Sequence, residues 1–154
     1  MAPKLNEIEY KNILEVDKNL LYQFYSIAFP SRNETLYKNW SWIYRTSFGN
    51  SQPIVALYKK KIIGHAGLIP NKLSFGNSIF NGIWFVDFFV LPEFRNIGLG
   101  KILTKKWMEL EDFHLTFCNK KSLQVFKKFN WIENDSYYKS CKIINPLKWI
   151  PLIN

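Results

Sequence analysis

Two glycines and two basic residues lie close together in the stretch Arg-Asn-Ile-Gly-Leu-Gly-Lys, which runs from Arg95 to Lys101. Glycine has no Cβ, so backbone amides beside Gly98 and Gly100 can approach an anion closely. An amphipathic run follows, and a helix N-terminus offers unpaired N–H groups with a partial positive charge. The stretch therefore predicts a binding site for a pyrophosphate group, with formal charge added on either side.

Two common phosphate-binding motifs are excluded by single residues. The nucleotide P-loop requires serine or threonine after its Gly-Lys pair, where this chain has Ile102. The dinucleotide fingerprint Gly-x-Gly-x-x-Gly requires glycine where this chain has Leu103. The remaining pattern, Arg95-x-x-Gly98-x-Gly100, resembles the coenzyme A loop (Gln/Arg-x-x-Gly-x-Gly/Ala) of the GNAT superfamily of N-acetyltransferases. The preceding Val-Leu-Pro-Glu-Phe-Arg also resembles that family's V-x-P-E-Y-R entry.

A strand and a helix must position this loop. The run from Trp84 to Leu91 is apolar except for Asp87, which predicts a strand covered on both faces, and Pro92 ends it. After the loop, apolar residues recur at the spacing of one helix face. These residues are Leu99, Ile102, Leu103, Trp107 and Leu110. The alternative interpretation is a glycine-rich strand-to-helix turn that binds no ligand.

The rest of the chain supplies the other elements of such a fold. Asp17 is the expected N-cap of a helix that ends before Pro30, and Ser31 to Glu34 has the spacing of a capping box that opens a second helix. The resemblance implies an α+β (mixed α/β) three-layer GNAT-like fold, a single domain over residues 1–154 with a central, mostly antiparallel, twisted sheet flanked by helices. Strands are expected near residues 8–16, 54–58, 62–69, 84–91, 114–119, 131–132 and 136–144, with hairpin turns at 59–61 and 75–78 and a last helix over 122–130.

The resemblance also implies acetyl-CoA (coenzyme A) as the cofactor and direct acyl transfer to an amine. The pantetheine arm would pair with backbone groups of Phe89, Val90 and Leu91, and the N–H of Val90 or Leu91 would polarise the thioester carbonyl. The family's late motif resembles the region that contains Asn119 and Phe126, which adds both to the expected cofactor site. The diphosphate would lie on the amides of Asn96, Ile97, Gly98, Leu99, Gly100 and Lys101, beside Arg95.

The sequence does not single out one general acid or one general base for the acyl transfer. The family's usual acid is a tyrosine, and the residue at that position is Phe126. Tyr138 or Tyr137 could replace it, the thiolate could leave unassisted, or activity could be low or lost. Asp87 is the candidate base, since a carboxylate in an apolar strand is unusual. Its alternative is a structural role, bonded to backbone amides or a neighbouring tryptophan.

Composition sets broad limits. A chain of 154 residues with 47% hydrophobic content can bury a full core, and its net charge of +9 favours anionic partners. Cys118 and Cys141 are too few for a disulfide scaffold, so a reduced cytoplasmic setting is expected. No signal peptide, membrane span or metal site is predicted. The apolar tail from Ile144 is expected to pack on the domain or to cover a partner subunit, as in a homodimer.

Three functions are consistent with the sequence. The first is an N-acetyltransferase that acts on a primary amine of a small molecule, with a sugar amine or metabolite preferred over a protein lysine. The second is a catalytically degenerate acyl-CoA-binding or regulatory domain, which Phe126 motivates. The third is RNA binding, which the charge motivates, but no nucleic-acid motif accompanies it.

Overall fold

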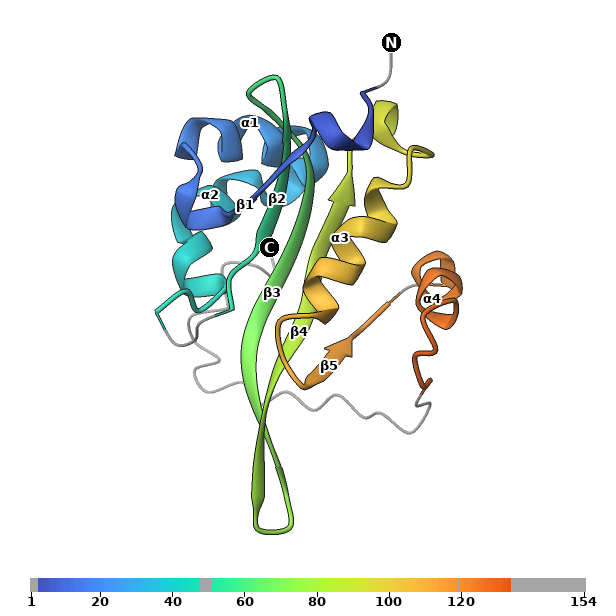
Figure 1. Ribbon diagram of the computed structural model, residues 1–154. Helices are drawn as coiled ribbons and strands as arrows, with labels where there is room; N and C mark the ends of the chain where they lie inside the picture. The colour runs from blue at the N-terminus through green and yellow to red at the C-terminus, as the bar shows by residue number, and fades with distance from the viewer. Residues whose placement is uncertain (1–2, 48–50, 119, 134–154) are drawn as a thin grey trace, which may run out of the picture. The chain divides into compact units, whose positions relative to one another are not determined.

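The computed structural model describes residues 3–47, 51–118 and 120–133 (Figure 1), which fall into two parts, up to Phe117 and from Cys118 onward. The first part contains β1 (Glu9–Asn12), α1 (Lys18–Ala28), α2 (Asn33–Ile43), β2 (Ile54–Tyr58), β3 (Lys61–Phe75), β4 (Ser78–Val90), α3 (Leu99–Met108) and β5 (Phe113–Thr116), with 3-10 turns η1 (Leu5–Glu7), η2 (Ile13–Glu15), η3 (Pro30–Arg32) and η4 (Pro92–Phe94). The second part contains α4 (Lys120–Lys127).

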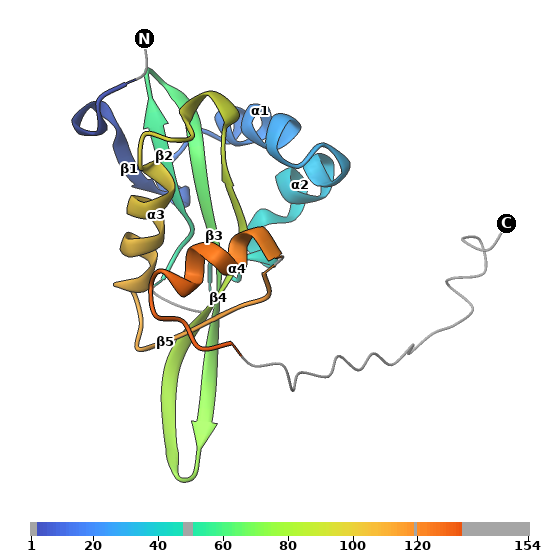
Figure 2. The same cartoon turned by 90° about the vertical axis from the view of Figure 1, so that its right-hand side faces the viewer.

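The five strands of the first part form one sheet in the order β1-β2-β3-β4-β5. The first four pair antiparallel, and β4 pairs parallel with β5. Helices α1 and α2 cover one face and α3 the other (Figure 2). Neighbouring residues of β3 show this arrangement, because Gly64 faces Leu103 of α3 while the His65 ring contacts Phe24 and Tyr25 of α1. The α+β, mostly antiparallel prediction is confirmed.

The first two helices begin differently. Asp17 caps α1 as predicted, accepting a hydrogen bond of 2.7 Å from the Asn19 amide. The capping box predicted from Ser31 to Glu34 is wrong, because α2 begins at Asn33 and no side chain caps it. Pro30 instead starts the 3-10 turn η3, whose first position suits the fixed φ of proline.

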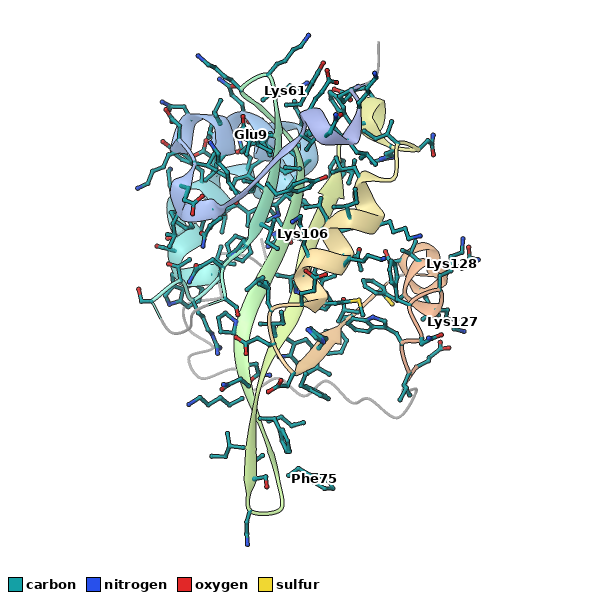
Figure 3. The ribbon with its side chains drawn as sticks, viewed as in Figure 1. Glu9, Lys61, Phe75, Lys106, Lys127 and Lys128 are labelled. Atoms are coloured by element: carbon teal, nitrogen blue, oxygen red, sulfur yellow. The ribbon has the colours of Figure 1, made fainter. Side chains whose placement is uncertain are left out.

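The β3–β4 hairpin is longer than the sequence predicted. Its strands continue to Phe75 and Ser78, on either side of a turn in which Gly76 has a φ of +57°. Residues 71–81 pair mainly with each other and, in the described part of the chain, with no other strand of the sheet. Their apolar side chains are therefore not buried, and the sequence carries no clear strand pattern here. Phe75 lies at the tip of the hairpin, at the opposite end of β3 from Lys61 (Figure 3). The large apolar side chains of residues 71–81 are exposed: Leu73, Phe75, Ile79 and Phe80.

In the second part, α4 confirms the predicted late helix, though it ends earlier, at Lys127. The Phe126 ring contacts Trp131 at 4.7 Å between centroids. Among residues 120–133, no strand forms at Trp131 and Ile132, where one was predicted. The predicted strand at 136–144 lies outside the described residues.

Candidate active site

The N-terminus of α3 presents backbone amides without a side-chain cap. The helix begins after Gly98, whose φ of +85° lies in the left-handed region that favours glycine. The Ile102 amide makes the first hydrogen bond of the helix, to the Gly98 carbonyl at 3.2 Å. The amides of residues 99–101 therefore have no acceptor within the helix. A Cβ built on Gly98 would have one neighbour within 4 Å, Leu5 at 3.9 Å. The amides at this helix start therefore suit an anion such as a diphosphate.

Two further features shape this loop. Asn96 is also left-handed, with a φ of +65°, so two residues in this conformation, Asn96 and Gly98, turn the chain before the helix begins. A Cβ at Gly100 would meet the Phe88 ring at 3.5 Å, an ordinary contact. The start of α3 therefore lies against the Phe88 ring of β4, and Lys101 is exposed there.

Arg95, whose charge the sequence predicted beside the glycines, contacts the end of β4. Its Nε donates a hydrogen bond of 2.9 Å to the Val90 carbonyl, and its guanidinium carbon lies 5.2 Å from the centre of the Phe89 ring. Arg95 thus braces the end of β4 while the residue as a whole stays exposed.

At the end of β4, some backbone groups are hydrogen-bonded to β3 and others point away from it. The Leu91 amide donates 2.9 Å to the Ile63 carbonyl, and Phe89 lies opposite His65 in the sheet. Backbone groups of successive strand residues point to opposite sides, so Val90 directs its N–H and C=O away from β3. Its carbonyl accepts from Arg95, in agreement with this direction. The pairing of β4 with β5 ends at Phe85, so among the described strands the edge of β4 is open beyond that residue. Of the three residues expected to pair with pantetheine, Val90 is the one whose backbone N–H and C=O point to this open edge.

A β-bulge lies within this open part of β4, between Val86 and Phe89. Between the pairs His65↔Phe89 and Gly67↔Val86, β3 has one residue and β4 has two, Asp87 and Phe88. Asp87 has a φ of +47°. A non-glycine residue in this conformation costs about 1–3 kcal/mol and persists only where its surroundings hold it. The side chains around Asp87 therefore matter.

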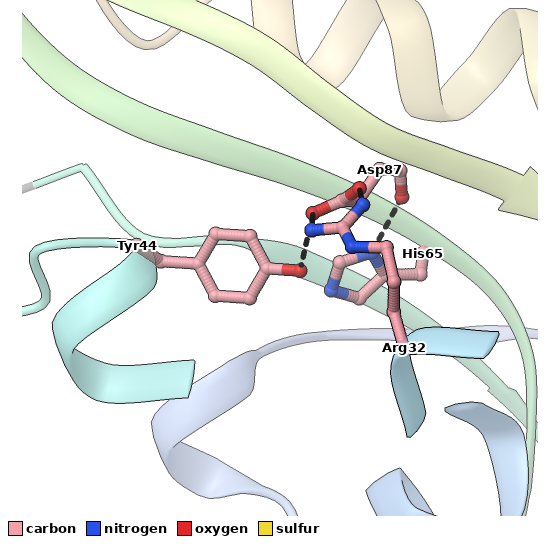
Figure 4. Close-up of polar contacts among 4 residues, drawn as sticks. All are labelled: Arg32, Tyr44, His65 and Asp87. Atoms are coloured by element: carbon pink, nitrogen blue, oxygen red, sulfur yellow. Dashed lines mark hydrogen bonds and ion pairs between the residues drawn. The ribbon is translucent and has the colours of Figure 1, made fainter. Parts of the chain in front are cut away.

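Three side chains hold Asp87 (Figure 4). The Arg32 guanidinium donates to both carboxylate oxygens, at 2.6 and 3.4 Å, and the Tyr44 hydroxyl donates at 3.0 Å. The His65 Nδ1 donates 2.8 Å to the backbone carbonyl of Asp87, which fixes the ring tautomer because a carbonyl only accepts. The Asp87 side chain is 10% exposed. Its partners are thus neither the backbone amides nor the tryptophan expected from the sequence.

Sequence reasoning connected neither Arg32 nor Tyr44 with Asp87, because both lie far from it along the chain. Burial raises the pKa of Tyr44, and nearby Tyr25 and Asp87 raise it further, so this hydroxyl keeps its proton and donates. The hydrogen bond to Asp87 raises the pKa of Arg32. No pattern in the sequence could have joined these residues, because the α1–α2 connection and the bulge meet only in the folded sheet.

Burial of His65 predicts a pH dependence of stability. Burial lowers the pKa of His65, so the folded protein keeps the ring neutral while the unfolded chain takes up a proton below pH ~6.5. The free energy of unfolding should therefore fall as the pH is lowered, by up to about 1.4 kcal/mol per pH unit. Urea unfolding between pH 7.5 and 5.5 measures this slope.

The matched variants are His65→Asn, which keeps a donor for the Asp87 carbonyl, and His114→Asn. Burial also lowers the pKa of His114, so the second variant reports that residue's share of the slope. We expect His65→Asn to flatten the slope more. Equal slopes in wild type and His65→Asn would show that this ring is not buried in the neutral form.

The described structure does not test the other predicted site residues. Asn119 and Tyr138 lie outside the described residues. Phe126 belongs to α4, in the second part of the chain. Across residues 3–47, 51–118 and 120–133, no helix is long and apolar enough to cross a bilayer, and no cluster of His, Cys, Asp and Glu could hold a metal ion.

Solved structures share this fold at low sequence identity. A glucosamine-6-phosphate N-acetyltransferase from Arabidopsis thaliana has a TM-score of 0.65 at 14% identity, over 90% of this chain and 99% of that chain. A predicted acetyltransferase from Clostridium acetobutylicum with acetyl-CoA has a TM-score of 0.68 at 12% identity, over 92% and 97%. An aminoglycoside N-acetyltransferase in complex with CoA has a TM-score of 0.65 at 14% identity, over 88% and 93%.

Sequence comparison identifies the family. No curated protein matches the chain. The profile of the Acetyltransferase (GNAT) family matches residues 18–131, which include both early helices, the β4 strand and the glycine loop. Structures of this family with acetyl-CoA or CoA bound imply an acetyl-CoA donor. The chain therefore belongs to the acetyltransferase (GNAT) family and is, by class, an acetyl-CoA-dependent N-acetyltransferase.

Proposed function

We propose that this chain transfers an acetyl group from acetyl-CoA directly to a primary amine of a small molecule. The observation that carries the proposal is the uncapped start of α3, where left-handed Gly98 leaves the first amides of the helix open beside exposed Lys101. Acetyl-CoA would supply the activated acetyl group. The amides from Asn96 to Lys101 would hold its diphosphate.

The backbone of β4 would orient the reacting end. Val90 faces the open edge and is followed by Leu91, whose amide is already bonded to Ile63. We therefore assign to the Val90 N–H the polarisation of the thioester carbonyl, since a fixed donor stabilises negative charge that develops on oxygen. Phe89 would contribute through its ring and through the contact with Arg95 rather than through its amide.

Proton transfer has a different assignment from the one expected. Asp87 binds Arg32 and Tyr44 through its carboxylate, so we propose that it shapes the strand and does not remove the amine proton. Deprotonation through water is consistent with this arrangement. Tyr138, with Tyr137 as the alternative, remains the proposed acid for the leaving thiolate, and Asn119 and Phe126 remain proposed cofactor contacts on the resemblance alone.

Amino sugars and related metabolites are the proposed acceptors. Two of the structures that share this fold are named for such substrates, glucosamine-6-phosphate and aminoglycosides. A cytoplasmic location and a homodimer are also part of the proposal; the first follows from the low cysteine content.

A second candidate is an acyl-CoA-binding domain without catalysis, which Phe126 at the family's tyrosine position favours. Two measurements separate the candidates. Calorimetry with acetyl-CoA should show binding under both, and release of free thiol over a panel of amino sugars, polyamines and lysine peptides should occur only with an enzyme. Absence of binding would overturn both candidates, and binding without turnover would favour the second.

A further inference from the structure

The bulge at Asp87 decides which backbone groups of β4 face the open edge. Side-chain and backbone directions alternate with a period of two, so one extra residue reverses them for everything that follows. The extra residue in β4 precedes Phe88 and Val90. Without the bulge, the Val90 N–H would turn toward β3 and an adjacent amide would take its place.

The bulge is held by side chains from three separate elements. Arg32 comes from η3, Tyr44 follows α2, and His65 lies on β3. Together they bond both the carboxylate and the carbonyl of Asp87. Gly67 adds a packing constraint, since a Cβ there would lie 2.7 Å from the Val86 carbonyl and 3.1 Å from both the His65 and Tyr44 rings.

We propose that Arg32, Tyr44 and His65 are positioning residues for acyl transfer, which hold Asp87 in its left-handed conformation and thereby aim the Val90 N–H at the open edge. The inference rests on the proposed function, because it assigns that N–H a role in the reaction. It predicts that the α1–α2 connection controls turnover through the Arg32–Asp87 ion pair, without contact with the diphosphate loop.

Arg32 is the best position to test, because its side chain is half exposed and its loss opens no core cavity. Its partner Asp87 is only 10% exposed, so loss of Arg32 leaves a largely buried carboxylate without its cation and lowers stability as well. The matched control is Lys38→Met, which removes the exposed ion pair between Lys38 and Glu34 on the neighbouring helix α2. Both variants delete one cation of an ion pair, but only the Arg32 pair includes a largely buried carboxylate, and only Arg32→Met reaches the bulge.

The kinetic experiment compares wild type, Arg32→Met, Arg32→Lys, Tyr44→Phe and Lys38→Met. We expect Arg32→Met to lower kcat on the order of 10- to 100-fold through misplacement of the reacting groups. CoA affinity by calorimetry should stay close to that of wild type. Arg32→Lys should restore part of kcat, because an ammonium keeps the charge without the bidentate fork. Tyr44→Phe, which keeps the ring, should lower kcat less than Arg32→Met, and Lys38→Met should match wild type.

A ligand-free measurement separates this inference from the proposed function. In amide NMR spectra, the Val90 resonance should move in Arg32→Met and stay in place in Lys38→Met, whether or not any amine is acetylated. An unmoved Val90 resonance, or equal losses of kcat and CoA affinity, would overturn the positioning role. Absence of CoA binding in wild type would overturn the proposed function alone, and the NMR comparison would still decide whether Arg32 holds the bulge.

Discussion

Replacement of Gly98 by valine should abolish measurable binding of acetyl-CoA and leave the sheet intact. The φ of +85° at this position strains any side chain with a Cβ, and a β-branched one most of all. To relieve the strain, the chain must rotate the amides at the start of α3 away from their common direction. The added methyls would also occupy the space beside the loop, where Leu5 at 3.9 Å is the single neighbour within 4 Å.

Gly76→Val is the matched control for this variant. Gly76 has a φ of +57° at the hairpin tip, and a Cβ there would have no neighbour within 4 Å. Both variants therefore carry a left-handed strain of about 1–2 kcal/mol, and only one of them lies at α3. Calorimetry and thermal shift should show acetyl-CoA binding by Gly76→Val and none by Gly98→Val. If Gly98→Val bound acetyl-CoA as wild type does, the diphosphate would lie elsewhere.

This loop was predictable because its signal is local. Glycines in a strand-to-helix connection, a proline after the strand and apolar residues at helical spacing all lie between Trp84 and Leu110, so they predict strand, turn and helix without long-range information. Leu99, Leu103 and Trp107 are buried as the spacing predicted, although Leu110 is partly exposed beyond the end of α3. The order of strands followed from the same kind of pattern, together with the resemblance to the family.

The geometry behind Asp87 was not predictable, because it depends on pairing between distant segments. The sequence indicated that Asp87 is unusual, because it is a carboxylate in an apolar strand, and the structure gives it a left-handed conformation and specific side-chain partners. It could not show that β4 has one more residue than β3 at this point, since a bulge is a property of two strands in register. Nor could it show that Arg32 approaches Asp87, since the helix start predicted at Ser31 would have placed this arginine inside α2.

Replacement of Tyr138 by phenylalanine should lower kcat by about 10²- to 10⁴-fold if its hydroxyl protonates the leaving thiolate. The KM for acetyl-CoA should change little, because a general acid acts on charge that develops in the transition state. The change removes one oxygen, and Tyr137→Phe, the same change at the alternative acid, shows which of the two hydroxyls acts. Steady-state thiol release with a saturating acceptor measures both variants. Equal kcat values for Tyr138→Phe and wild type would exclude this tyrosine as the acid.

Phe126→Tyr completes the test, because it restores the residue type that the family carries at this position. If Tyr138 has taken over the acid role, Phe126→Tyr should change wild-type kcat little and should recover part of the activity lost in Tyr138→Phe. If the chain instead lacks an acid and turns over slowly for that reason, Phe126→Tyr alone should raise kcat, by a factor in the same range of about 10² to 10⁴. The kcat of Phe126→Tyr therefore differs between the two cases: it stays near that of wild type if another residue has replaced the acid, and it rises if the acid is missing. This difference separates an active transferase from a degenerate relative even before its acceptor is optimised.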